Sequence, residues 1–323
     1  MTTTATMAAA PRAAASARTT APAKASRPTR STTTSRSDQS SRRPRGAAFF
    51  LSGAGASEHR LKTLAAAMAA AVTLSALACA QELDPLLEDA GVTGALIVHR
   101  VSDGREWTGG GNRVDERFIP ASTFKIPNSL IILETGVVTD AATEILPWDG
   151  ETRWLEVWNQ DQTLAEAFPR STVWAYQHWA REVGHDDMTS QVAALGYGSG
   201  DIGGPEDVDS FWLEGPLTIS AREQVGLLAR LHARDLPVRE EVMETVISVM
   251  QTGAGEDWIL RGKTGWRFDG EPDIGWHVGW LEQGGETYLF ALNIDMPDPD
   301  REVALRTVLT RRALESASGW QGG

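Results

Sequence analysis

A hydroxyl and an amine stand three positions apart in the segment Ser122-Thr123-Phe124-Lys125, just after Pro120. If a helix begins there, positions i and i+3 share a face, so Ser122 Oγ and Lys125 Nζ would meet beside the helix N-terminus. Serine needs an adjacent base to become a nucleophile, and a buried lysine can be that base because desolvation disfavours its charged form. The spacing supplies the two central parts of a covalent acyl-transfer site, although for this motif alone the bland alternative is favoured and only the rest of the chain reverses that preference. The alternative is an ordinary helix start, with the serine as a cap and the lysine in water.

A second polar segment, Lys263-Thr264-Gly265, lies inside a predicted strand 141 positions after Ser122 and is followed by Trp266. A lysine, a hydroxyl and a glycine in a row suit an anion-binding wall, because glycine allows close approach to the backbone. The tripeptide is a weak signal alone. Together with an upstream S-x-x-K it is typical of the penicillin-recognising serine enzymes.

The elements that must position these segments follow from the hydrophobic patterning. Strands are predicted at 94–101, 105–108, 260–264, 275–282 and 287–295. Helices are predicted at 120–134, over much of 151–234 and at 301–318, and Ser220 with Glu223 forms a capping box. The pattern predicts an α+β protein. Its antiparallel sheet is built from both termini and flanked by helices, and a mostly helical lobe completes it.

The N-terminal quarter of the chain has a different composition. Residues 1–57 are rich in Ala, Ser, Thr, Arg and Pro and are predicted to be disordered or an upstream leader. Residues 58–80 are predicted to be a signal peptide, with a short cationic stretch, an uncharged run and an A-x-A cleavage signature ending at Ala80. Cleavage there would release residues 81–323 as one exported domain, periplasmic or secreted. A lipid anchor at Cys79 is the less favoured alternative.

Charge and cysteine content exclude several kinds of partner and catalytic group. Residues 81–323 hold 19 Lys and Arg against 41 Asp and Glu, a net charge near −22 that argues against nucleic acid as a partner. Cys79 is the only cysteine, so the exported domain has no disulfide and no thiol nucleophile. The histidines show no metal-binding spacing, and no metal site or membrane span is predicted. The domain would be a monomer or a homodimer.

From about residue 84 to 316 the chain resembles the class D (oxacillinase-type) serine β-lactamases. The resemblance rests on the segments P-A-S-T-F-K-I-P-N at 120–128, S-T-V at 171–173, F-W-L-E-G-P-L-T-I-S at 211–220 and K-T-G-W at 263–266, with Leu305-Arg306 near the C-terminal helix. One departure is Ser199, which stands where the family usually has asparagine after Tyr-Gly. The resemblance implies the serine β-lactamase/D,D-peptidase fold and hydrolysis of β-lactam antibiotics, which confers resistance.

The resemblance also implies roles for particular residues. Lys125 would be N-carboxylated by CO2 or bicarbonate and act as the general base, with no bound cofactor. The other catalytic residues would be Ser122 as nucleophile with Ser171 and Lys263 as proton carriers. The oxyanion hole would use the backbone N–H groups of Ser122 and Trp266. Trp212 and Val173 would stabilise the carbamate, and Thr264, Gly265 and Arg306 would bind the substrate.

Alternatives stay open at this point. A penicillin-binding or sensor domain of the same fold would acylate without efficient turnover. An esterase or D,D-peptidase would use the same serine and lysine on other substrates. A tryptophan-rich binding module would need no S-x-x-K. Ser171 could cap the helix that follows it.

Overall fold

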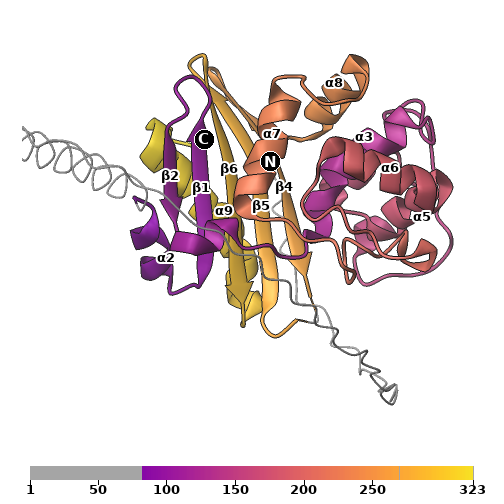
Figure 1. The fold of residues 1–323 in the computed structure, drawn as a ribbon, viewed down its shortest axis with the longest axis horizontal. Helices are drawn as coiled ribbons and strands as arrows, with labels where there is room; N and C mark the ends of the chain where they lie inside the picture. The colour runs from indigo at the N-terminus through magenta and orange to yellow at the C-terminus, as the bar shows by residue number, and fades with distance from the viewer. Residues whose placement is uncertain (1–81, 269, 323) are drawn as a thin grey trace, which may run out of the picture. The chain divides into compact units, whose positions relative to one another are not determined.

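The computed structural model describes residues 82–268 and 270–322, so the predicted leader, the signal peptide, Cys79 and Ala80 lie outside the described residues. A six-stranded antiparallel sheet forms the frame, in the order β2-β1-β6-β5-β4-β3 (Figure 1). The strands are β1 Gly94–Arg100, β2 Glu106–Gly109, β3 Gln251–Ala254, β4 Trp258–Arg267, β5 Asp273–Gln283 and β6 Glu286–Met296.

The register explains why the sheet draws on both ends of the described chain. Strand β1 pairs along its whole length with β6, with Ile97 opposite Ala291 at the centre. Side chains on β1 and β6 are buried on both faces, so the centre of each strand is a continuous apolar run, and polar residues enter β6 only towards its ends, as at Asn293 and Asp295. The predicted α+β class and the antiparallel sheet built from both termini are therefore confirmed.

Eight α-helices accompany the sheet in the described residues. They are α2 Asp84–Ala90, α3 Lys125–Glu134, α4 Leu164–Arg170, α5 Val173–Val183, α6 His185–Leu195, α7 Ala221–His232, α8 Glu240–Val249 and α9 Pro299–Ser318. The predicted capping box is present at the start of α7. Ser220 Oγ accepts from the Glu223 N–H at 3.1 Å, and the Glu223 carboxylate accepts from the Ser220 N–H at 2.9 Å.

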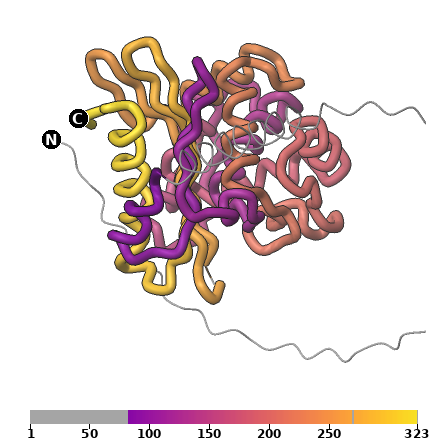
Figure 2. The backbone as a smooth tube through the Cα atoms, turned by 60° about the vertical axis from the view of Figure 1, so that its left-hand side comes forward, coloured from indigo at the N-terminus to yellow at the C-terminus, as the bar shows by residue number. Residues whose placement is uncertain are grey.

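The helices lie on both faces of the sheet. Helix α9 covers one face, while α7 lies on the other, beside the lobe that holds α3, α5 and α6 (Figures 1 and 2). The core under α9 includes Leu96, Phe290 and Leu309. A second core runs from the opposite face of the sheet through α7 into the helical lobe. Nine of the ten residues of α3 are buried, so this helix crosses the interior of the lobe and starts at the sheet.

No described helix combines the length and the apolar character that crossing a membrane requires.

Candidate active site

The nucleophile segment begins with a tighter turn than the predicted helix at 120–134. Residues Ala121–Phe124 form a 3₁₀ turn, η2, and α3 begins only at Lys125. The physical reason is Ala121, whose φ of +47° lies in the left-handed region and prevents an α-helix from starting at Pro120. Side chains at i and i+3 eclipse in a 3₁₀ turn, and Lys125 Nζ donates to Ser122 Oγ at 3.1 Å. The predicted contact is confirmed, although the helix that was expected to make it starts later.

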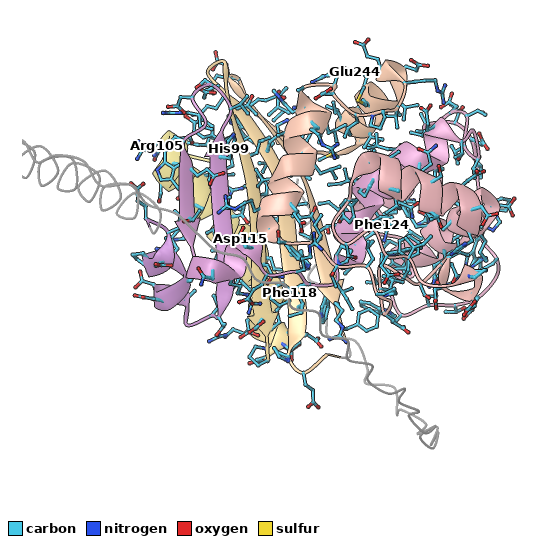
Figure 3. The ribbon with its side chains drawn as sticks, in the orientation of Figure 1. His99, Arg105, Asp115, Phe118, Phe124 and Glu244 are labelled. Atoms are coloured by element: carbon cyan, nitrogen blue, oxygen red, sulfur yellow. The ribbon has the colours of Figure 1, made fainter. Side chains whose placement is uncertain are left out.

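Lys125 lies in an apolar cage. Its side chain is fully buried, and the ring of the preceding Phe124 stacks on Trp212 at 5.5 Å between centroids (Phe124 is labelled in Figure 3). Phe211 and Tyr197 close on the same ring edge-on, at 5.0 Å and 5.4 Å. Burial, with the nearby positive charge of Lys263 as a second cause, holds the pKa of Lys125 well below its usual value. A neutral amine within hydrogen-bond reach of a serine can act as its base.

The cage also contains a donor without an acceptor. Trp212 is fully buried, and its Nε1–H has no hydrogen-bond partner among the described residues. Leaving a buried donor unsatisfied costs about 1–3 kcal/mol, and the indole N–H can only donate. The aromatic cluster around Phe124, the residue next to Lys125, therefore offers one donor to a further acceptor.

The K-T-G segment lies where β4 has no strand on its outer side. Strand β3 pairs only with residues 259–261 of β4, so within the described chain Lys263 to Arg267 is an edge. The strand is thus an edge over only half its length. Turn η2 packs here, because a Cβ on Gly265 would lie 3.0 Å from Pro120 O and 3.1 Å from Thr123 Cγ2. A side chain at this position would push the nucleophile turn away from the strand by a few tenths of an ångström.

Two buried cations, Lys263 of β4 and Arg306 of α9, meet at this half of the strand. Lys263 is 4% exposed, its Nζ donates to Thr264 O at 3.0 Å, and burial, aided by the charge of Arg306, lowers its pKa to about 7. Arg306 reaches the strand from α9, donating to Gly265 O at 2.6 Å and to Val303 O at 2.9 Å. Burial lowers the pKa of Arg306 to about 10. Arg306 thus ties α9 to the strand through one donor, while its Nε donor bonds a carbonyl of α9 itself.

Ser171 sits at the junction between α4 and α5. Its φ of +57° ends α4, and its N–H donates to Phe168 O at 3.1 Å. Thr172 is the N-cap residue of α5, so the expectation that Ser171 caps this helix is wrong: its left-handed backbone closes the preceding helix instead. Val173 packs against the core cluster that contains Phe124 and Trp212. Lys263 Nζ lies 5.9 Å from the Phe168 ring, which connects α4 to β4.

Sequence reasoning missed two residues of the cage. Lys125 Nζ lies 4.9 Å from the centre of the Tyr176 ring, and the Tyr176 hydroxyl is 2.8 Å from Ser129 Oγ. Ser129 Oγ also donates to Lys125 O at 2.7 Å. The i+4 spacing of Ser129 from Lys125 was a usable signal. Tyr176 gave none, because only the packing of α5 on α3 brings it there.

Among the described residues, no group of three or more His, Cys, Asp or Glu side chains is arranged to hold a metal ion. A serine hydrogen-bonded to a buried lysine and facing a K-T-G strand, on an antiparallel sheet joined to a helical lobe, defines the class of penicillin-recognising serine enzymes.

Comparisons with known proteins narrow this class. Residues 100–314 match the family of penicillin binding protein transpeptidase domains. Beta-lactamase OXA-48 of Klebsiella pneumoniae is 41% identical over 222 residues, covering 69% of this chain and 82% of that protein. Beta-lactamase OXA-2 of Salmonella typhimurium is 41% identical over 205 residues, covering 63% and 72%. The solved class D β-lactamase YbXI from Nostoc is 41% identical with a TM-score of 0.71, covering 73% of this chain and 98% of that one.

The chain belongs to the class D β-lactamases, a family of serine hydrolases. The predicted family and fold are confirmed.

Proposed function

We propose that this enzyme hydrolyses β-lactam antibiotics through an acyl-enzyme on Ser122 and thereby confers resistance to them. The observation that carries the proposal is the buried amine of Lys125, 3.1 Å from Ser122 Oγ and depressed in pKa by its apolar cage. Relatives that are named β-lactamases add support.

In the proposed reaction Ser122 Oγ loses its proton to the base and attacks the lactam carbonyl. The C–N bond of the lactam then breaks, and Ser171 and Lys263 carry a proton to the departing nitrogen. The backbone N–H groups of Ser122 and Trp266 stabilise the oxyanion, each contributing about 3 kcal/mol to the transition state. Lys263, Thr264, Gly265 and Arg306 bind the substrate carboxylate. Water attacks the ester to release the product and restore the serine.

The base itself is proposed to be the N-carboxylated form of Lys125, made from CO2 or bicarbonate. Two features fit this modification. Burial holds the pKa of the Lys125 amine well below its usual value, which favours the neutral form that adds CO2, and Trp212, stacked on the neighbouring Phe124, has an unsatisfied Nε1–H. A carbamate supplies an anionic base with two acceptor oxygens. Trp212 would donate to one of them, and Val173 would keep the cage apolar.

Steady-state hydrolysis of a chromogenic cephalosporin by residues 81–323, with and without added bicarbonate, tests the proposal. Turnover that rises with bicarbonate supports the hydrolase with a carbamylated base. Turnover indifferent to bicarbonate keeps the hydrolase and removes the carbamate. A stoichiometric burst that stays low with bicarbonate favours the alternative, a penicillin-binding or sensor domain, which the family match to transpeptidase domains also allows.

Export is part of the proposal, because the segment 58–80 has the organisation of a signal peptide. The mature enzyme, periplasmic or secreted, would begin at Gln81. N-terminal sequencing and intact mass of the exported protein test this. A mature chain that starts at a lipidated Cys79 would replace cleavage after Ala80.

A further inference from the structure

One buried carboxamide links the two loops beside Ser171. Gln162 is fully buried, and its Oε1 accepts from Arg170 Nη1 and from Thr172 Oγ1, each at 3.2 Å. Its Nε2 donates to Val157 O at 3.2 Å and to Gln160 O at 3.0 Å. An amide has two acceptor positions and two donor hydrogens, so this side chain is fully satisfied.

The orientation of this amide is fixed by its partners. A guanidinium can only donate, so Oε1 must face Arg170, and backbone carbonyls can only accept, so Nε2 must face Val157 and Gln160. The residues held by Oε1 are the immediate neighbours of Ser171 on either side. Gln162 is held in its turn by two backbone bonds with Leu146, at 2.8 Å and 3.0 Å.

Two tryptophans strengthen the same junction. Trp158 Nε1 donates to Arg170 O at 2.9 Å, and Trp174 Nε1 donates to Trp158 O at 2.9 Å. Hydrogen bonds therefore fix the backbone carbonyl of Arg170, just before Ser171, in addition to the side chains of Arg170 and Thr172. Ser171 needs such support, because its backbone has a φ of +57°, and a non-glycine residue keeps this strained conformation only where neighbouring contacts stabilise it.

We infer that Gln162 is a positioning residue for the β-lactamase reaction: its carboxamide ties the loop at 157–160 to both neighbours of Ser171 and sets the direction of the Ser171 hydroxyl. The inference rests on the proposed role of Ser171 in proton transfer. Gln162 itself touches no substrate. Its loss therefore lowers the rate of the chemical step and leaves substrate binding largely intact.

Gln162→Met keeps the length of the side chain and removes all four hydrogen bonds. In the holoenzyme with saturating bicarbonate we expect kcat to fall about tenfold or more, while KM changes by less than about twofold. Thr172→Val removes only one of the contacts beside Ser171 and should give a smaller fall of the same kind. Thr163→Ala is the matched control, because it removes the N-cap of α4, whose Oγ1 accepts from the Glu166 N–H at 3.3 Å, and leaves the amide contacts in place.

A double-mutant cycle with Ser171→Ala tests whether Gln162 acts through Ser171. If Gln162 acts through Ser171, Gln162→Met changes kcat by less than about twofold in the Ser171→Ala background. Equal and additive losses in both backgrounds, or a loss of kcat in Thr163→Ala as large as in Gln162→Met, overturn the inference in favour of general destabilisation. A Ser171→Ala enzyme with native kcat overturns instead the proposed role of Ser171, which separates the two failures.

Discussion

Trp212→Phe isolates the proposed contact between the indole and the carbamate. The substitution keeps an aromatic ring to stack on Phe124 and deletes only the fused ring that carries Nε1–H. A hydrogen bond to a charged acceptor contributes about 1.5–3 kcal/mol, and 1.4 kcal/mol corresponds to a tenfold change in an equilibrium constant. The bicarbonate concentration that gives half-maximal carbamylation should therefore rise about 10- to 150-fold.

Carbon-13 NMR with labelled bicarbonate measures the carbamylated fraction directly, and the dependence of kcat on bicarbonate measures it through turnover. Thermal unfolding gives a third reading, because a modification made only in the folded state stabilises it by mass action. The native enzyme should gain Tm with bicarbonate, and the variant should gain less over the same range.

Trp320→Phe is the matched control for this measurement. Trp320 is 2% exposed, its Nε1–H also has no partner among the described residues, and it packs against Trp258 at the other side of the sheet. This variant should keep the native bicarbonate response despite the same loss of volume. If Trp212→Phe reaches half-maximal carbamylation at the native bicarbonate concentration and turns over fully at low bicarbonate, Trp212 does not donate a hydrogen bond to the carbamate.

Three further predictions concern the nucleophile, the anion wall and the glycine contact. Ser122→Ala should abolish the mass increase that follows incubation with penicillin, and a stable adduct on that variant would contradict the assigned nucleophile. Because the pKa of Lys263 is about 7, binding of a substrate carboxylate should take up roughly one proton at pH 8.5 and almost none at pH 6. Calorimetry in buffers of different ionisation enthalpy measures this proton uptake. Uptake that persists in Lys263→Arg would assign the proton to another group. Gly265→Ala should destabilise the enzyme by about 1–3 kcal/mol and lower kcat, because its Cβ would press on turn η2. Gly226→Ala, on the open surface of α7, should stabilise it by about 1 kcal/mol, so equal Tm values for the two variants would contradict the reasoning.

The parts of the structure that the sequence predicted are those with local signals. The strands that became β1, β5 and β6 carry long apolar runs, and the capping box at Ser220 marks the start of α7 within one residue. Strand β3 was missed because Gln251–Ala254 is largely exposed and has no apolar pattern; it owes its conformation to pairing with β4. The pairing of Ser122 with Lys125 was predicted from spacing alone.

The parts that the sequence did not predict depend on tertiary contacts. The left-handed backbone of Ala121 and of Ser171 has no residue signature, since alanine and serine rarely adopt it unless packing imposes it. Gln162 reads in the sequence as one polar residue in a polar loop, and only the fold brings Arg170 and Thr172 to it. The contact of Arg306 with Gly265 likewise depends on α9 packing across β5 and β6, from which the arginine reaches β4.

The last helix contributes to a site whose nucleophile lies near the start of the domain. Arg306 belongs to α9 and supports Gly265, which in turn receives the turn that carries Ser122. A chain that has not finished folding already contains the serine and the lysine, yet it lacks the strand and the docked arginine that complete the wall opposite. Covalent labelling by a fluorescent penicillin should thus begin only when the final helix has docked. The time course of labelling would therefore report when folding is complete.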